Sequence, residues 1–437
     1  AGITIADGSG GTASNYTLTG GTHNFTTNQR PLNATLARQY DGTSNVAGSD
    51  LSSFDALQGG ETLTLSGSGS AVNDNVANGI SVSSLGTLAL INGTGLASNY
   101  SLNSAAINIT QRVLTSSGSK TYDANTNALA ADITLSNLVS GEALNHSGTA
   151  SISSANAGSY TITNLSGITI ADGSGGAASN YTLTGGTHNF TVNPKVISLS
   201  GSRLYDATTD AVASDLTTIS GLVGSETLNL SGTGSVTNAN VASNKTVTLG
   251  TLALADNSGL AANYTLSGGT HQLTINQRPL AATVARQYDG TKTAAGSDLS
   301  SFDALQGGET LTLSGSGTVG DENVANGQGI TLGTLALVDG TGLASNYSLN
   351  SASLNITERV LNSSGSKTYD ANTNALAGAI TLSNLVSGEA LNHSGTATIS
   401  SANAGSYTIT NLAGITIADG SGGTASNYTL TGGTHNF

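Results

Sequence analysis

Five Tyr-Asp pairs are the residues whose types and spacing first suggest chemistry in this chain. A lysine or an arginine stands two positions before each tyrosine. Lysine beside a carboxylate could form an isopeptide crosslink, but arginine occupies that position in three of the five cases. The sequence therefore favours a structural corner, in which the ring packs at the core edge and the aspartate accepts backbone N–H groups of the next turn. The pairs are Tyr40-Asp41, Tyr122-Asp123, Tyr205-Asp206, Tyr288-Asp289 and Tyr369-Asp370.

The basic residue shares a strand face with its tyrosine, because alternate residues of a strand point the same way. This allows either a cation over the ring or a salt bridge. The residue after each Tyr-Asp pair is Gly42 or Gly290 in two cases and alanine in the other three, at positions 124, 207 and 371. A position that accepts alanine is not expected to need a positive φ.

Single carboxylates in loops raise the question of calcium. Asp7, Asp172, Asp256, Asp339 and Asp419 each precede an Asn-Tyr pair within a Gly-rich loop, and Asn92 takes the same place once. Calcium needs a cluster of oxygen ligands, and each loop offers one carboxylate. Turn chemistry explains Asp-Gly without a metal, so no cofactor is expected, and calcium stays open as the weaker alternative.

Six histidines occur in "GGTHNF", "GGTHQL" and "NHSG" contexts, without a second ligand at metal spacing. We expect exposed strand or turn positions for them. A Ser-His-Asp triad is not excluded by counting residues, but a catalytic constellation should occur once and not be spread over repeats. We therefore expect no enzyme.

The composition excludes several classes of protein. Cys, Met and Trp are absent, which rules out disulfides and a Cys nucleophile. Charged residues make up 9% and the net charge is −14, which argues against nucleic acid as a partner. No apolar run is long enough to span a bilayer as a helix.

The sequence repeats with a period of 81–84 residues. The Tyr-Asp pairs lie 82, 83, 83 and 81 positions apart by subtraction, and Asn-Tyr recurs with them. The Asn-Tyr tyrosines are Tyr16, Tyr100, Tyr181, Tyr264, Tyr347 and Tyr428, and a glutamate before an apolar strand recurs at Glu61, Glu142, Glu226, Glu309 and Glu389. Residues 1–25 are identical to residues 413–437. The predicted organisation is residues 1–27 as the C-terminal part of a preceding repeat, followed by repeat 1 (28–109), repeat 2 (110–192), repeat 3 (193–275), repeat 4 (276–356) and repeat 5 (357–437, last strand truncated).

Apolar and polar residues alternate with a period of two, as in "GETLTLSGSG" and "KTVTLGTLAL". Alternation rich in Thr, Val and Ile predicts half-buried strands, and Gly-containing pairs predict the turns between them. About seven short strands fit each repeat, which is typical of an immunoglobulin-like β-sandwich. We predict an all-β rod of such sandwiches, each about 35–40 Å long, with a private core. A β-helix or other solenoid is the alternative.

Each repeat carries an ordered series of motifs: basic-x-Tyr-Asp-Gly/Ala, "SGEAL" or "GGETL", "LSGSG", "NVANG" or "NVASN", "LGTLAL", "ASNYSL" and "INIT". This series closely resembles the YDG domain, which occurs in tandem in large bacterial surface proteins. Many of those resemble filamentous-haemagglutinin-type adhesins exported by two-partner secretion. Repeats 2 and 5 depart from the pattern, because "SANAG" replaces "NVANG".

The resemblance implies a non-enzymatic stalk or filament of a bacterial adhesin, located outside the cell. It would project a binding tip or build biofilm matrix fibres. Two alternatives remain: the repeats themselves bind glycan or ice, or the chains polymerise by strand exchange. The expected partners are polysaccharide or other copies of the chain.

Overall fold

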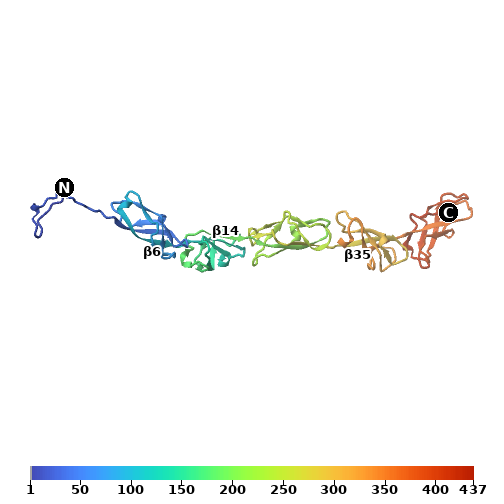
Figure 1. Cartoon of the computed structure of the whole chain (residues 1–437). Helices are drawn as coiled ribbons and strands as arrows, with labels where there is room; N and C mark the ends of the chain where they lie inside the picture. Colours follow the sequence, from blue (N-terminus) through green and yellow to red (C-terminus); the bar gives the residue numbers. More distant parts are fainter. Residues whose placement is uncertain (1) are drawn as a thin grey trace. The chain divides into compact units, whose positions relative to one another are not determined.

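The computed structural model describes residues 2–437, which form strands joined by turns and single 3₁₀ turns (Figure 1). The chain divides into two compact units, residues 1–194 and 195–437. Every sheet takes its strands from a single repeat, and no sheet among residues 2–437 continues from one repeat into the next. The prediction of an all-β chain of separate domains is thus confirmed over a solenoid. No helix in this described part is long and apolar enough to cross a membrane.

In unit 1, repeat 1 forms one six-stranded sheet, ordered β2-β5-β6-β8-β1-β3, and a separate two-stranded antiparallel sheet, β4-β7. Its strands are β1 (Arg30–Gln39), β2 (Asn45–Ala47), β3 (Leu51–Phe54), β4 (Leu63–Ser66), β5 (Ser68–Ala71), β6 (Ala77–Ser84), β7 (Ala89–Asn92) and β8 (Tyr100–Thr110), with 3₁₀ turns at Gly48–Asp50 and Ala97–Asn99. A further 3₁₀ turn, Ala13–Asn15, precedes them.

Repeat 2 completes unit 1 with the same order of elements. Its strands are β9 (Arg112–Val113), β10 (Thr115–Thr121), β11 (Asn127–Leu129), β12 (Ile133–Ser136), β13 (Leu144–Ile152), β14 (Gly158–Asn164), β15 (Ile168–Asp172), β16 (Tyr181–Thr182) and β17 (His188–Asn193), with 3₁₀ turns at Ala130–Asp132 and Ala178–Asn180.

Unit 2 holds repeats 3 to 5. Repeat 3 contains β18 (Lys195–Val196), β19 (Ser198–Leu204), β20 (Asp210–Val212), β21 (Thr218–Ser220), β22 (Asn229–Ser231), β23 (Thr233–Ser235), β24 (Ala242–Thr246), β25 (Ala253–Ala255), β26 (Tyr264–Thr265) and β27 (His271–Asn276), with 3₁₀ turns at Ala213–Asp215 and Ala261–Asn263. Repeat 4 contains β28 (Arg278–Gln287), β29 (Thr293–Ala295), β30 (Leu299–Phe302), β31 (Leu311–Ser314), β32 (Ser316–Thr318), β33 (Ala325–Gly329), β34 (Ala336–Asp339) and β35 (Tyr347–Thr357), with 3₁₀ turns at Gly296–Asp298 and Ala344–Asn346. Repeat 5 contains β36 (Arg359–Val360), β37 (Asn362–Gly365), β38 (Asn374–Leu376), β39 (Ile380–Ser383), β40 (Asn392–Ile399), β41 (Ile409–Asn411), β42 (Ile415–Ala418) and β43 (Tyr428–Thr429), with 3₁₀ turns at Ala377–Ala379 and Ala425–Asn427.

The first and last strands of every repeat lie side by side and run parallel. In repeat 1 they are β1 and β8, and ten residue pairs join them, from Arg30↔Tyr100 to Gln39↔Thr110. The equivalent pair in repeat 4, β28 and β35, also has ten. In repeats 2 and 3 the ladder is split into a short and a longer part, β9–β16 with β10–β17, and β18–β26 with β19–β27. Repeat 5 keeps the short part, β36–β43.

The interior follows from the alternation along these strands. Leu32, Ala34 and Leu36 of β1 are buried, and the residues between them are more exposed. The prediction that each repeat has a private core is wrong, however. The apolar cluster around Leu36 in repeat 1 also contains Leu114 and Tyr181 of repeat 2. In unit 2, the cluster of repeat 4 likewise includes Leu361 and Tyr428 of repeat 5. The core continues across these two junctions because a tyrosine ring of the next repeat packs into the clusters of repeats 1 and 4.

Candidate functional site

Tyr40 of the first Tyr-Asp pair reaches out of its own repeat. Its backbone N–H donates to Thr110 O of the last strand at 2.9 Å, which fixes the residue at the end of repeat 1. Its hydroxyl donates to Glu142 Oε1 of repeat 2 at 2.6 Å. The ring is 5% exposed. The tyrosine of the Tyr-Asp pair is therefore a contact between repeats as well as a corner of its own repeat.

The same carboxylate receives a second tyrosine. Tyr181, from the Asn-Tyr pair of repeat 2, donates its hydroxyl to Glu142 Oε2 at 2.6 Å and accepts the N–H of Val139 at 3.0 Å. The rings of Tyr40 and Tyr181 meet edge to face, with centroids 5.5 Å apart and planes at 80°. Both hydrogen bonds have the short length of O–H donors on an ionised acceptor. Glu142 thus binds one phenol from each of two repeats.

Unit 2 contains this arrangement twice. Tyr205 and Tyr347 donate to the two oxygens of Glu309, and Tyr288 and Tyr428 donate to those of Glu389, each at 2.6 Å. The ring centroids are 5.3 Å and 5.5 Å apart, again edge to face. We call each set of two tyrosines and one glutamate the Tyr-Glu-Tyr junction.

A buried asparagine ties the same repeats together beside the rings. Asn180, which precedes Tyr181, is 1% exposed. Its Oδ1 accepts the N–H of Val76 in repeat 1 at 3.0 Å, and its Nδ2 donates to Asn75 Oδ1 at 3.0 Å. In unit 2, Asn346 makes these two contacts with Val241 and Asn240, and Asn427 makes them with Val324 and Asn323. The Asn-Val of the "NVANG" motif is therefore the partner of the Asn-Tyr of the following repeat.

An arginine at the start of each following repeat adds a third tie. Arg112 donates to the backbone oxygen of Tyr40 at 3.4 Å, Arg278 to that of Tyr205 at 3.2 Å and Arg359 to that of Tyr288 at 3.3 Å. Each of these arginines also donates to a backbone carbonyl of its own repeat. The guanidinium fork therefore bridges the Tyr-Asp corner and the repeat that receives it.

A family model for the YDG domain matches the chain five times, at residues 28–108, 106–191, 187–273, 270–355 and 353–435. The chain belongs to the YDG-domain family. No curated protein matches it in sequence. In both units, the tyrosine of the Tyr-Asp pair that gives the YDG repeats their recurring signature contacts the next repeat.

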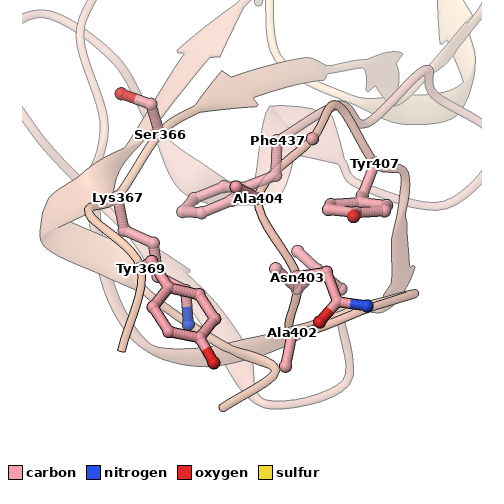
Figure 2. Close-up of a pocket in the computed structure, with 10 residues that line it drawn as sticks. Ser366, Lys367, Tyr369, Ala402, Asn403, Ala404, Tyr407 and Phe437 are labelled. Atoms are coloured by element: carbon pink, nitrogen blue, oxygen red, sulfur yellow. The ribbon is translucent and has the colours of Figure 1, made fainter. Parts of the chain in front are cut away.

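Tyrosines of the same two motifs recur elsewhere in the YDG repeats. In repeat 1, Tyr100 donates to Glu61, and in repeat 3 Tyr264 donates to Glu226 at 2.6 Å. Tyr122 of repeat 2 is buried. Tyr369 of repeat 5, shown in Figure 2, is 63% exposed, the largest departure from the 2–5% of the other four Tyr-Asp tyrosines.

Burial and the nearby carboxylate change the acidity of the junction phenols. Burial, followed by the hydrogen bond to Glu309, raises the pKa of Tyr347 to about 12, and the same causes with Glu389 raise the pKa of Tyr428 to about 12. Burial and the hydrogen bond to the next repeat's glutamate also raise the pKa of Tyr40, Tyr205 and Tyr288. The phenols stay protonated because a phenolate would face a carboxylate in a poorly hydrated site.

Stability should therefore fall at alkaline pH. An unfolded tyrosine has a pKa near about 10, so between about pH 10 and 12 the unfolded chain loses protons that the folded chain keeps. Below about pH 10 the phenols are protonated in both the folded and the unfolded chain, so they do not make the free energy of unfolding depend on pH. We expect the free energy of unfolding of unit 2 to decrease through this window, measured by urea denaturation at each pH. Tyr428→Phe should have a shallower slope, and an unchanged slope would contradict the assignment.

Each aspartate of the Tyr-Asp pairs holds its own turn, as the sequence predicts. Asp41 Oδ1 accepts the N–H of Thr43 at 3.0 Å, and the other four accept the N–H two residues on. The preceding basic residue forms a salt bridge to this aspartate, as with Lys120 and Asp123 at 2.8 Å. Of the two contacts considered for the cation, the ion pair is the one formed. Burial alone would raise the pKa of Asp123, but the hydrogen bond from Lys120, the hydrogen bonds from Asn125 and the charge of Lys120 together outweigh it, and the pKa is lowered.

The expectation for the residue after Tyr-Asp is wrong. Ala124, Ala207 and Ala371 have φ of 62°, 63° and 61°, in the left-handed region, like Gly42 at 74° and Gly290 at 71°. The Asp-capped turn and the ion pair hold the backbone there despite the cost to alanine. Glycine at position 42 has a second reason, because an added Cβ would lie 2.7 Å from Val139 Cγ1 of repeat 2.

Replacing Ala371 by glycine should therefore stabilise repeat 5. Relief of the left-handed backbone strain should raise the free energy of unfolding by about 1–2 kcal/mol. The greater conformational freedom of glycine in the unfolded chain should lower it by about 0.5–1 kcal/mol. We expect a net gain of up to about 1.5 kcal/mol in the free energy of unfolding, measured by urea denaturation. The control is Ala390→Gly, an exposed alanine outside the left-handed region, which should be destabilising. Equal effects of the two changes would contradict the strain argument.

The loop aspartates considered for calcium accept backbone N–H groups of the 3₁₀ turns that follow them. Asp172 Oδ1 accepts the N–H of Ala178 at 2.8 Å, which caps the 3₁₀ turn before Asn180 and Tyr181. The same bond recurs at Asp7, Asp256, Asp339 and Asp419, and Asn92 makes it in repeat 1. Among residues 2–437 there is no group of three His, Asp or Glu that could hold a metal ion. These carboxylates therefore position the Asn-Tyr pair that enters the junction.

Removal of divalent ions should leave the chain unchanged. Since each loop carboxylate is already satisfied by a backbone N–H, we expect the same Tm with excess EDTA and with millimolar calcium. Differential scanning calorimetry measures both. A Tm that falls with EDTA and recovers with calcium would contradict this prediction.

Two of the six histidines are buried, contrary to the expectation of exposed positions, whereas His23 is exposed as expected. His188 is 4% exposed and His271 is 6% exposed, and neither is a surface residue. His188 Nδ1 lies 2.9 Å from Ser116 Oγ, and its Nε2 lies 2.8 Å from the carbonyl oxygen of Leu183. A carbonyl only accepts, so Nε2 carries the proton and Nδ1 accepts from the serine. The Ser116–His188 hydrogen bond joins the first and last strands of repeat 2. The other ring nitrogen of His188 contacts the backbone carbonyl of Leu183, whereas the histidine of a catalytic triad contacts a carboxylate.

Sequence reasoning found the members of the junction but not the junction itself. The recurring glutamate, the Asn-Tyr pair and the "NVANG" motif were each visible as repeats. The signal that they belong together is that all three occur once per period with Tyr-Asp. Their meeting across two repeats is given only by the fold.

Proposed function

We propose that these YDG repeats are the load-bearing stalk of an extracellular bacterial adhesin, without enzymatic activity. The stalk projects a binding tip or builds matrix fibres of a biofilm. Export by two-partner secretion, as in filamentous-haemagglutinin-type adhesins, is part of the proposal and rests on the sequence resemblance. The polar, Thr-, Ser- and Asn-rich composition and the net charge of −14 support a location outside the cell.

The parallel pairing of first and last strands is the observation that carries this proposal. The chain enters each repeat at the start of the first strand and leaves at the end of the last. Because the two strands are parallel, these points lie at opposite ends of the pair. A pull along the chain therefore shears the ladder, and its evenly spaced hydrogen bonds must break together. In repeats 1 and 4 this ladder has ten residue pairs.

The Tyr-Glu-Tyr junctions support the same function. A flexible linker would let neighbouring repeats bend, and these repeats have none between their last and first strands. Within each unit, two phenols, a glutamate, a buried asparagine and an arginine join one repeat to the next. Such a junction resists bending and keeps load on the terminal strands.

Single-molecule pulling of the 437-residue chain tests the proposal. Unfolding one repeat of 81–83 residues should lengthen the chain by about 250 Å, from about 3.5 Å per extended residue less the folded length. We expect a series of such steps. Ala285→Pro should lower the force of the step from repeat 4, because proline cannot donate within β28. Extension at low force without steps would contradict a load-bearing role.

Adsorption of the same chain separates this proposal from glycan or ice binding. A stalk should not bind polysaccharide or ice by itself. Saturable binding of the repeats would favour the alternative in which the repeats are the adhesive part.

A further inference from the structure

One loop position differs between repeat 1 and the other repeats. It is an asparagine, Asn92, in repeat 1 and an aspartate in repeats 2 to 5. In every repeat its Oδ1 accepts the N–H of a following alanine, and for Asn92 the donor is Ala97 at 2.7 Å. Asn92 is exposed, and so are Asp172 and Asp339 in repeats that follow another repeat, so the exposure is a property of the loop. The loop therefore accepts an acid at this position.

Asn92 is followed by Gly93, which gives an exposed Asn-Gly pair at the end of β7. In the part of the chain that the structure describes, the N–H of Gly93 has no acceptor. In repeats 2 to 5 the equivalent N–H is bonded within its own loop, as in Gly340 to the carbonyl of Gly342 at 3.1 Å. In repeat 1 a side-chain amide thus stands next to an unbonded backbone nitrogen.

This pair has the groups for a reaction within the backbone. A backbone nitrogen can attack the side-chain carbonyl carbon of a preceding asparagine, and glycine has no side chain to hinder the approach. The N–H of Ala97 points at Oδ1 of Asn92, where negative charge develops as the nitrogen adds. The Gly93 nitrogen loses its proton and bonds to Cγ, the Cγ–Nδ2 bond breaks, and the amide leaves as ammonia. Water then opens the cyclic imide at the side-chain carbonyl to give aspartate, or at the main-chain carbonyl to give isoaspartate.

The chain has two further Asn-Gly pairs, one in β6 and one in β33, and both lack the free nitrogen. In β6 the N–H of Gly79 donates to Asn108 Oδ1 at 2.8 Å. In β33 the N–H of Gly327 donates to Asn355 Oδ1 at 2.7 Å. Each of these nitrogens must leave its hydrogen bond before it can attack. The fold therefore protects these two pairs and leaves Asn92 open to reaction.

We propose that Asn92 is a self-modifying site, which converts to aspartate through a cyclic imide formed with the nitrogen of Gly93. The change needs only water, it is one-way because ammonia is lost, and it adds one negative charge to the net charge of −14. Repeat 1 thereby acquires the carboxylate that repeats 2 to 5 carry from the start. A carboxylate accepts a stronger hydrogen bond than an amide, so aspartate holds the 3₁₀ turn Ala97–Asn99 more firmly.

Incubation of the 437-residue chain in mildly alkaline buffer, followed by peptide mass spectrometry, tests the site. We expect position 92 to convert at least about tenfold faster than positions 78 and 326 in the folded chain, since those two must first break a hydrogen bond. In urea the three pairs have no tertiary contacts and should convert at similar rates. An amide that persists at position 92 of the folded chain, or equal rates at the three positions there, would overturn the proposal. A difference that persists in urea would place its cause in the local sequence and would overturn the role of the fold.

Two variants test the protection separately from repeat stability. Asn355→Ala frees the N–H of Gly327 in repeat 4 and leaves repeat 1 untouched. Conversion at position 326 should rise towards the rate at position 92, while the rate at position 92 stays as in the parent chain. Asn92→Asp gives the product as a reference, and on anion exchange the aged parent chain should move to the position of this variant. An unchanged rate at position 326, or a parent chain that does not move, would contradict the proposal.

Discussion

Replacing Tyr288 by alanine is expected to lower the free energy of unfolding of unit 2 by about 3–5 kcal/mol. The ring is 4% exposed and lies edge to face against Tyr428. Its removal opens a cavity between repeats 4 and 5 and takes one of two hydrogen-bond donors from Glu389. Urea denaturation followed by tyrosine circular dichroism measures the change, since the chain has no tryptophan.

The matched control is Tyr369→Ala, which removes the same residue of the same motif. Tyr369 is 63% exposed, so this change should cost less than about 1 kcal/mol. A structural corner confined to each repeat would make the two substitutions similar. A large difference between them shows that the tyrosine acts through the following repeat, and similar losses would contradict the junction.

Replacing Glu309 by alanine should cost about 2–4 kcal/mol. The carboxylate accepts hydrogen bonds from Tyr205 and Tyr347, and its loss leaves both phenols without their acceptor in a poorly hydrated site. Glu309→Gln should fall between the parent and the alanine variant, because the amide keeps one oxygen that can accept. The measurement is again urea denaturation.

Glu61→Ala provides the comparison for this prediction. In repeat 1 the carboxylate accepts from Tyr100, and no Tyr-Asp tyrosine donates to it in the structure of residues 2–437. We therefore expect about half the loss found for Glu309→Ala. A double-mutant cycle of Glu309→Gln with Tyr205→Phe should give a coupling above about 0.5 kcal/mol. Independent effects at these two positions would contradict a direct contact.

The junction also explains why the repeats keep motifs that their own sandwiches do not need. A β-sandwich core needs alternating apolar residues, and it does not need a glutamate, an asparagine and two tyrosines at fixed places. Those residues contact the neighbouring repeat. In repeats 2 and 5, "SANAG" stands in place of the motif whose Asn75 and Val76 contact Asn180 of the following repeat in unit 1.

The sequence alone determined the period, the β-class, the turns and the Asp-capped corners. These are local properties, because alternation, turn residues and side-chain capping act over a few positions. The tertiary structure decided where the tyrosines go, since Tyr40 and Glu142 lie 102 positions apart and a repeat places equivalent residues at the same offset in every copy. A periodic sequence cannot say whether a partner lies in its own repeat or in the next. The left-handed alanines and buried histidines were hidden for a related reason: residue type gives a preference, and the ion pairs and strands around those positions override it.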